Sequence, residues 1–233
     1  MKICVIGFEA VTLGKHNIRD PRLDAVDKLV RPKKKTYIQV ELAAEDSALE
    51  SDAILVSLDS RADLILKDLD FVETRLSKEI PDIEKAILNK LKSSLEKEEF
   101  IASCVLSDEE KKAISGYSLL TSRSVITAQK EEAQNLDTLL SRVLEQSGYI
   151  SFFTAGEKET RAWLIKKGAT SWEAAGAIHS DIQRGFIRAE IISFNDYIQA
   201  GGETPAKQAG KLRLEQKNYV MQDADVAMFR FNK

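Results

Sequence analysis

The order of apolar and polar positions changes twice along this chain of 233 residues. Near its start, Lys2–Gly7 is a short apolar run, rich in β-branched residues and closed by glycine, which predicts a strand buried on both faces. Thr36–Leu42 and Asp52–Leu58 predict two further strands. A buried opening strand that ends in glycine is typical of an α/β nucleotide-binding domain.

Between Arg61 and Glu99 the apolar residues recur at helical spacing, and charged residues fill the other faces. The apolar positions are Leu66, Leu69, Val72 and Leu76, followed by Ile83, Ile87, Leu91 and Leu95. Because Pro81 separates the two sets, the pattern predicts two helices that fold back as a hairpin over residues 61–99. Such a hairpin is either an arm that binds a partner or a helix pair packed on the chain's own core, and the sequence leaves both open.

Shorter helices are predicted from their end signals. Asp20 and Pro21 are typical of the cap and the first position of a helix. Ser107 as a cap and Gly116 as a terminator bound another short helix. Residues 131–146 form a third predicted helix, with its apolar residues on one face. Those residues are Leu136, Leu139, Leu140 and Val143.

The last third of the chain, Gly148–Lys233, contains a second series of strand-like runs. The predicted strands are Tyr149–Phe153, Thr160–Ile165, Phe186–Ile192, Asn218–Gln222 and Val226–Phe231. A helix is expected from Ser171 to His179, and His179 is expected to close it. This order predicts an α+β sheet with a helix on one face.

The composition is that of an ordinary globular protein, with 43% hydrophobic residues. The 34 basic and 37 acidic residues leave a net charge of −3, so any binding of a polyanion has to be local. Cys4 and Cys104 match no metal-binding or disulfide spacing and are expected to be buried thiols. We expect a cytoplasmic protein, because no apolar run reaches membrane-spanning length and the opening segment is too short for a signal peptide.

Catalytic and metal-binding patterns are missing from the sequence. His16 and His179 are the two histidines, and neither stands in a Ser/His/Asp, Cys/His or metal-ligand grouping. We therefore predict no catalytic residue and no metal site.

The segment after the first strand has the residues of a phosphate-binding loop without its spacing. Such a loop reads Gly-x-x-x-x-Gly-Lys-Ser/Thr and leads directly into a helix. Here Gly7 and Gly14 stand seven positions apart, and His16 follows Lys15 where a hydroxyl residue belongs. Residues 17–21 then form a turn toward a different helix, so the anion-binding helix N-terminus is lost or displaced. We expect no cofactor, with ATP or GTP and Mg²⁺ as the alternative.

Cations and aromatic side chains alternate through the last third. The cations are Lys158, Arg161, Lys166, Lys167, Arg184, Arg188, Lys207, Lys211 and Arg213, and the aromatics are Phe152, Phe153, Trp163, Trp172 and Phe186. Because strand residues alternate between faces, Arg161 and Trp163 are expected on one face. A basic face with stacking aromatics is typical of an RNA or ribosome contact. The predicted contact residues are Arg161, Trp163, Lys166, Arg188, Lys207, Lys211 and Arg213. In the alternative interpretation, the aromatics form the core and the cations are ordinary surface residues.

These segments also carry a family resemblance. Five segments resemble, almost without gaps, the C-terminal TGS-type domain of the Obg-like ATPases, the YchF family: Ile150–Gly168, Ala175–Asp181, Gly185–Ile192, Ala206–Glu215 and Asp223–Asn232. The part before residue 148 resembles a shortened version of that family's nucleotide-binding domain. The resemblance implies a β-grasp, ubiquitin-like fold for residues 148–233, after a shortened P-loop NTPase-like α/β region over residues 1–147 that includes the hairpin.

The resemblance also marks what is missing. The family's switch II motif, Asp-x-x-Gly, has no counterpart in Glu41–Ser51, which lacks glycine. Its adenine-reading Asn-x-x-Glu is matched only by Gln129 and Glu132. The resemblance thus implies a vestigial nucleotide site made of Gly7, Gly14, Lys15, Gln129 and Glu132.

The function predicted from these observations is non-catalytic binding of a macromolecule, the ribosome or RNA, through the TGS-like domain. A protein partner at the helical hairpin and the absence of a membrane contact belong to the same prediction. The alternative is an ATP- or GTP-binding member of the family with a rebuilt phosphate loop and weak or absent hydrolysis.

Overall fold

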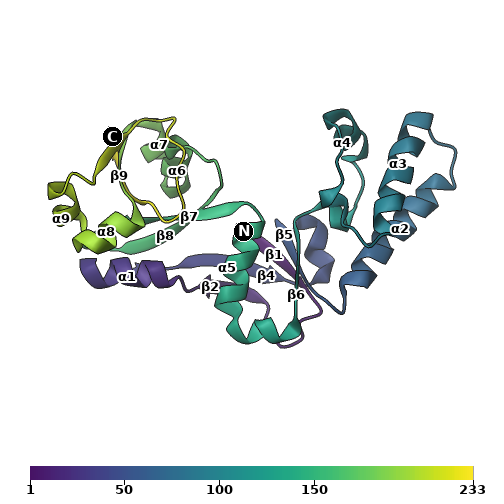
Figure 1. The fold of residues 1–233 in the computed structure, drawn as a ribbon, viewed down its shortest axis with the longest axis horizontal. Coiled ribbons are helices and arrows are strands. Elements are labelled where there is room, and N and C mark those ends of the chain that lie inside the picture. Colours follow the sequence, from purple (N-terminus) through teal and green to yellow (C-terminus); the bar gives the residue numbers. More distant parts are fainter. Residues whose placement is uncertain (233) are drawn as a thin grey trace. The chain divides into compact units, whose positions relative to one another are not determined.

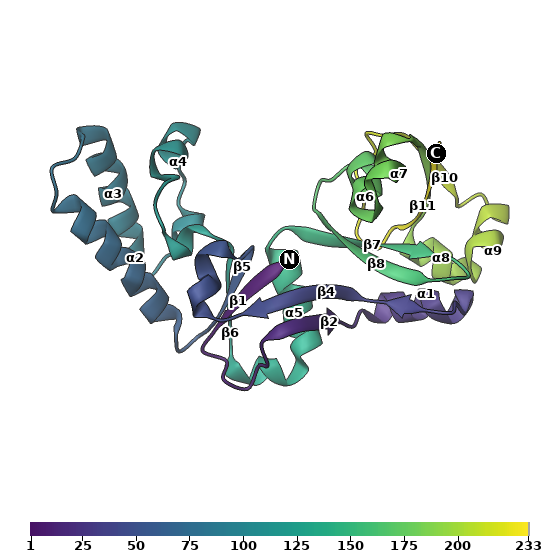
Figure 2. The same cartoon turned by 180° about the vertical axis from the view of Figure 1, so that it is seen from behind.

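The computed structural model describes residues 1–232 and divides into two compact units. Unit 1 contains residues 1–16 and 40–139, and unit 2 contains residues 17–39 together with the chain from residue 140 on. Figures 1 and 2 show the elements of both units from opposite sides. This division differs from the expected one at residue 148, because the segment 17–39 belongs with the C-terminal part of the chain.

The first sheet is a five-stranded sheet built around two buried strands. Its strands are β1 (Lys2–Ile6), β2 (Gly14–Ile18), β4 (Ile38–Ala43), β5 (Ala53–Ser57) and β6 (Val125–Ala128), in the order β2-β4-β1-β5-β6. β1 runs parallel to β4 and β5, and β5 runs parallel to β6. All five residues of β5 are buried, which explains their continuous apolar sequence.

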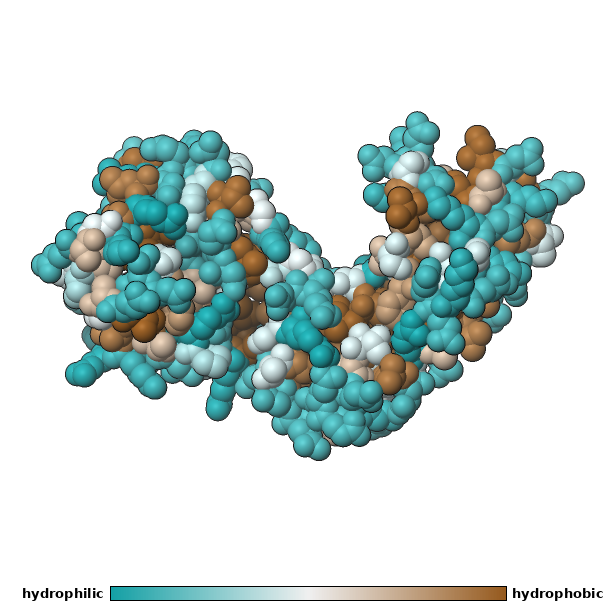
Figure 3. Space-filling model, viewed as in Figure 1, coloured by the Kyte–Doolittle hydropathy of each residue, from teal (hydrophilic) through white to brown (hydrophobic). Residues whose placement is uncertain are grey.

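The predicted helical hairpin is confirmed as α2 (Arg61–Leu76) and α3 (Asp82–Leu95). Most of its predicted apolar positions form a cluster with residues that follow it in the chain, in the turn η2 (Ile101–Ser103), in α4 (Asp108–Ile114) and just before the turn η3 (Leu120–Ser122). Leu66 and Ile83, in contrast, are exposed. Figure 3 shows apolar side chains gathered between α4 and the hairpin. The hairpin therefore packs on a small core of its own within unit 1.

Three further elements complete this part of the chain. The turn η1 (Glu45–Glu50) follows β4, and the turn η4 (Lys130–Asn135) follows β6. It leads directly into α5 (Leu136–Gln146), which confirms the helix predicted there.

The second sheet belongs to unit 2 and has six strands. They are β3 (Lys35–Thr36), β7 (Tyr149–Ala155), β8 (Thr160–Lys166), β9 (Phe186–Ile192), β10 (Arg213–Glu215) and β11 (Val226–Phe231), in the order β10-β9-β11-β7-β8-β3. β11 pairs parallel with β7, whereas β7 with β8 and β9 with β11 are antiparallel. The predicted strands at Phe186–Ile192 and Val226–Phe231 are confirmed with the same bounds.

Helices cover both faces of this second sheet. They are α1 (Pro21–Val30), α6 (Ser171–Ile178), α7 (Ser180–Arg184), α8 (Phe194–Ala200) and α9 (Glu203–Gln208). α6 buries Ala174 and Ala175 against Phe152, whereas α1 sends Arg22 over the neighbouring Phe153. Because adjacent strand residues point to opposite faces, α6 and α1 lie on opposite sides of the sheet, as Figure 1 shows.

One predicted strand of unit 2 is wrong. Residues 218–222 form only an isolated bridge between Thr170 and Val220. The backbone there bonds instead to the chain that leads into α6, with Ser171 N donating to Tyr219 O (2.7 Å) and Met221 N to Ala169 O (3.0 Å). The edge strand beside β9 is β10, and β3 is the edge strand at the other end of the sheet.

The short helices α8 and α9 were not predicted from the sequence. Ser193 caps α8 by accepting from Asp196 N, and Gly201 ends it with a positive φ of 83°. The cap residue and the following glycine are the local signals that could have identified α8. Within residues 1–232, no helix combines the length and the apolar character needed to cross a membrane.

Candidate functional site

The three residues of the predicted phosphate loop do not form a loop together. Gly7 follows β1 with a φ of 75°, and a Cβ there would lie 2.2 Å from Ser57 Oγ. Gly14 and Lys15 are the first two residues of β2, an extended strand. A phosphate loop presents backbone N–H groups and the N-terminus of the helix that follows it. The chain after Lys15 continues as a strand, so that geometry is missing.

The carboxyl ends of β1 and β5 carry acidic side chains. In parallel sheets this is the edge at which nucleotides bind. Lys130 Nζ lies 3.3 Å from Asp59 Oδ2 and 3.8 Å from Glu9 Oε1, so two carboxylates accompany one ammonium group. Within residues 1–232 no cluster of three or more His, Cys, Asp or Glu side chains is arranged to hold a metal ion. This edge is therefore unfavourable for a polyphosphate.

The residues proposed to read a base perform a local structural task. Gln129 N donates to Glu132 Oε1 (2.8 Å), and the Gln129 side chain accepts from the backbone of Glu132. The two side chains thus form a capping box at the start of η4. This contact accounts for both residues without a nucleotide.

Most of the aromatic residues singled out in unit 2 belong to its core. Phe152 and Phe153 are fully buried, and Phe186 is 7% exposed. Trp163 stacks on Phe152 with ring centroids 6.4 Å apart, and its indole N–H donates to Thr154 Oγ1 (2.9 Å). The core interpretation therefore holds for these residues.

Arg161 and Trp163 do lie together, as strand alternation predicted. The Arg161 guanidinium is 4.0 Å from the centroid of the Trp163 ring. Lys166 points to the opposite face of β8, where its Nζ lies 3.7 Å from the centroid of the Tyr149 ring. The cationic side chains of Arg161 and Lys166 thus lie on opposite faces of β8.

Three other predicted contact residues are neutralised by acidic neighbours. Arg188 lies 3.4 Å from Glu190, Lys211 lies 3.1 Å from Asp196, and Arg213 lies 3.5 Å from both Asp225 and Glu215. Lys207 is exposed on α9. The seven residues are spread over both faces and one edge of the sheet, so they do not form the single basic face that their sequence positions favoured.

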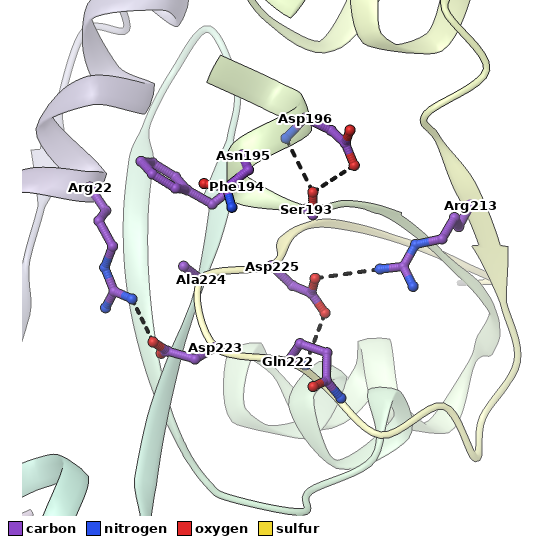
Figure 4. A pocket seen from close by; sticks show the side chains of 10 residues that line it. All are labelled: Arg22, Ser193, Phe194, Asn195, Asp196, Arg213, Gln222, Asp223, Ala224 and Asp225. Atoms are coloured by element: carbon purple, nitrogen blue, oxygen red, sulfur yellow. Dashed lines mark hydrogen bonds and ion pairs between the residues drawn. The ribbon is translucent and has the colours of Figure 1, made fainter. Parts of the chain in front are cut away.

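A pocket of about 720 Å³ lies within unit 2. Figure 4 shows the side chains that line it, which come from α1, the start of α8, β10 and the turn before β11. The charged lining residues are Arg22, Asp196, Arg213, Asp223 and Asp225. Acidic and basic groups therefore face the same space.

The charges of this pocket are paired with one another. Arg22 contacts Asp20 (2.8 Å) and Asp223 (2.5 Å). Burial disfavours its charge, but the hydrogen bonds to these two carboxylates outweigh burial and raise the pKa of the guanidinium. These contacts tie α1 to the turn before β11.

Asp225 is the most deeply buried acid of the pocket, with 2% of its surface exposed. Burial raises the pKa of its carboxyl, although Gln222 N (3.0 Å) and the Tyr219 hydroxyl (2.9 Å) donate hydrogen bonds to it. In the same pocket Ser193 Oγ donates to Asp196 Oδ2 (2.7 Å) and accepts from Asp196 N (3.2 Å), so this hydroxyl and carboxylate form the cap of α8.

Each of the two histidines contacts an aspartate. His179 ends α6 as predicted, and its Nδ1 accepts from Asp181 N (3.1 Å) at the start of α7. His16 Nε2 lies 3.0 Å from Asp137 Oδ1. Among residues 1–232, neither histidine belongs to a group of three or more His, Cys, Asp or Glu side chains that could hold a metal ion.

Trp172 is the functional candidate that the selection of contact residues missed. It is the second residue of α6 and is 41% exposed, whereas Phe152, Phe153 and Phe186 are buried. The signal available in the sequence was an aromatic residue at the second position after a helix cap, where the side chain points away from the core.

The C-terminal part of the chain matches a known protein family. Residues 149–232 match the YchF GTPase C-terminal family model, described as a protein of unknown function (DUF933). The chain is 34% identical over 235 residues to the ribosome-binding ATPase YchF of Bacillus subtilis (strain 168), covering 73% of this chain and 64% of that protein.

Two other relatives match shorter stretches at higher identity. The ribosome-binding ATPase YchF of Pasteurella multocida (strain Pm70) is 57% identical over 82 residues, covering 35% of this chain and 23% of that protein. Obg-like ATPase 1 of Danio rerio is 42% identical over 106 residues, covering 43% and 26%. The chain thus spans less than two thirds of the length of these relatives.

A solved structure shares the fold. The YchF GTPase of Schizosaccharomyces pombe superposes with a TM-score of 0.75 at 20% identity, covering 99% of this chain and 97% of that one. At this identity the likeness establishes the mixed α/β fold alone.

Proposed function

The chain belongs to the YchF family of Obg-like ATPases, and from this premise we propose that it binds the ribosome through unit 2 without hydrolysing a nucleotide. The relatives at 34% and 57% identity are named ribosome-binding ATPases. The proposal places the protein in the cytoplasm, where ribosomes act.

One observation carries the non-catalytic part of the proposal. Gly14 and Lys15 lie on strand β2, and the strand ends nearby carry Glu9 and Asp59. A triphosphate would meet negative charge without a cradle of backbone N–H groups. The C-terminal family match, in contrast, extends over residues 149–232.

We assign unit 2 to the β-grasp, TGS-like fold. Support comes from the central parallel pair β7 and β11, from the antiparallel strands on either side of this pair, and from α6 across one face. Helices cover both faces of this sheet, so its loops and strand edges remain for a partner.

Cosedimentation with purified ribosomes tests the proposal. The wild-type chain is expected to pellet with ribosomes at about 50 mM salt and to be released by about 200 mM, because contacts to phosphates release counterions. Arg161→Glu, in unit 2, is expected to weaken pelleting roughly tenfold.

Lys85→Glu on the hairpin makes the same charge change in unit 1 and serves as the matched control. It is expected to pellet like the wild type. Failure of the wild-type chain to pellet at low salt would show the proposal to be wrong. If Lys85→Glu lost pelleting while Arg161→Glu kept it, the ribosome contact would be assigned to the hairpin instead of unit 2.

A further inference from the structure

The exposed ring of Trp172 has an unusual setting in unit 2. It is 41% exposed, and within residues 1–232 no aromatic or cationic side chain covers it. The other tryptophan, Trp163, is covered by Arg161 on one side and Phe152 on the other. Of the two tryptophans, Trp172 therefore has the ring that is more open to a ligand.

The backbone at Ser171 and Trp172 is hydrogen-bonded to residues 216–219. Trp172 N donates to Lys217 O (3.3 Å), and the preceding Ser171 donates through its N to Tyr219 O (2.7 Å) and through Oγ to Gln216 O (2.6 Å). Ser171 itself is fully buried. A ring on so fixed a backbone loses little entropy when a ligand covers it.

The backbone segments next to Trp172 carry exposed apolar and cationic residues. Val220 is 45% exposed in the segment that carries Lys217. Lys167, in the turn before α6, and Lys217 are both exposed, and neither has an ion pair among the residues that the structure describes. We name Lys167, Trp172, Lys217 and Val220 the Trp172 surface.

Glu173, the acidic residue next to Trp172, is hydrogen-bonded to the helix cap. The Glu173 carboxylate accepts from Thr170 N and from Thr170 Oγ1, each at 2.7 Å. These hydrogen bonds, the backbone one first, lower the pKa of Glu173 and keep its charge at the helix cap. The Glu173 carboxylate thus stays ionised next to Trp172, and its two hydrogen bonds hold it toward Thr170.

We propose that the Trp172 surface binds single-stranded RNA, with an unpaired base stacked on Trp172 and flanking phosphates on Lys167 and Lys217. This inference rests on the proposed ribosome binding and names the contact. A base stacked on an aromatic ring adds to the affinity, and stacking needs an open ring face beside cations. An RNA duplex keeps its base faces stacked, so an unpaired loop fits this surface.

Fluorescence anisotropy with a labelled oligouridine tests the proposal on the full chain. Trp172→Ala is expected to weaken binding roughly tenfold, whereas Trp172→Phe keeps a stacking ring and stays within about threefold of the wild type. Lys167→Ala and Lys217→Ala are each expected to reduce the slope of log K against log salt by about 0.7.

Two control variants lie on the opposite face of the sheet from α6. Leu214→Ala removes an apolar side chain that is 56% exposed, opposite Glu190 in the ladder with β9, and Lys207→Ala removes a cation of α9. Both are expected to bind oligouridine like the wild type. Far-ultraviolet circular dichroism checks that every variant is folded.

The outcomes separate this inference from the proposed function. Unchanged oligouridine binding by Trp172→Ala overturns the inference, even when the wild type pellets with ribosomes. Weaker pelleting of Trp172→Ala without oligouridine binding by the wild type also overturns it and assigns the surface to a protein partner. A wild type that binds oligouridine through Trp172 but does not pellet with ribosomes contradicts the proposed function and leaves the surface in place.

Discussion

The ends of α1 show how single residues set the local backbone. Asp20 caps the helix by accepting from Arg22 N (2.8 Å), and Pro21 takes the first helical position. Arg31 ends it in the left-handed region, with φ 52° and ψ 56°, while its N–H donates to Asp27 O. A non-glycine residue in this region carries a steric cost between its Cβ and the following carbonyl.

Arg31→Gly is therefore expected to stabilise the protein. Glycine removes the Cβ contact but has more freedom to lose on folding, so the expected gain in the free energy of unfolding is about 0.5–1 kcal/mol. Urea unfolding with a constant slope measures it. Arg31→Ala keeps the Cβ and is the control. Equal stabilities of the glycine and alanine variants would contradict the explanation.

Gly14, which the sequence analysis assigned to the nucleotide site, also has a positive φ. Its φ of 111° at the start of β2 is a conformation that favours glycine. The backbone thus explains this glycine without a phosphate, and Lys15 beside it is an exposed strand residue.

At the scale of elements, a buried carboxylate joins α2 to the segment after α4. Asp68 is 2% exposed and accepts hydrogen bonds from Leu120 N (2.8 Å), Thr121 N (2.7 Å) and Thr121 Oγ1 (2.6 Å). Burial raises the pKa of Asp68, against these hydrogen bonds. The hairpin is thereby fixed to η3 as well as to its apolar cluster.

Asp68→Ala is expected to lower the free energy of unfolding by about 2 kcal/mol, because two backbone N–H groups then lose their acceptor in a buried place. Asp70→Ala, an exposed position of the same helix, changes the same residue type and is expected to have little effect. Thermal unfolding of the three proteins measures the difference. Similar losses for both variants would contradict the assigned role of Asp68.

The tip of the hairpin leaves one hypothesis untested. Ile83, in the first turn of α3, is 77% exposed, and the tip residues around it carry charges of both signs. A protein partner at this arm stays a prediction.

At the scale of the molecule, a sheet whose four strands β4-β1-β5-β6 are parallel, as in nucleotide-binding domains, has within residues 1–232 no phosphate loop at its strand ends. The mixed α/β architecture is that of the family. The expected behaviour toward nucleotides therefore follows from the loop and the charges around it, and the fold alone does not predict it.

Isothermal titration with ATP and with GTP, each with Mg²⁺, is expected to give no saturable heat at micromolar concentrations. A ligand at about 100 times its Kd stabilises a folded protein by about 2.7 kcal/mol, so thermal unfolding with nucleotide is a second measurement. Micromolar binding that Lys15→Ala abolishes would support the alternative of a rebuilt phosphate loop and contradict the expectation of no cofactor.

Local patterns in the sequence were sufficient for most elements. Periodicity and end signals predicted β1, the hairpin, α6 with its closing His179, β9 and β11, because these features depend on neighbours within one or two turns. The family resemblance of residues 148–233 was likewise readable from the chain itself and is confirmed.

Tertiary structure alone decided where those elements go and which side chains stay exposed. Residues 17–39 join unit 2 through contacts of α1 with β7 and β8, which lie more than a hundred positions away in the chain. The same long-range packing buries Phe152 and leaves Trp172 open. Burial depends on which element covers a face, and a local pattern of apolar and polar residues does not contain that information.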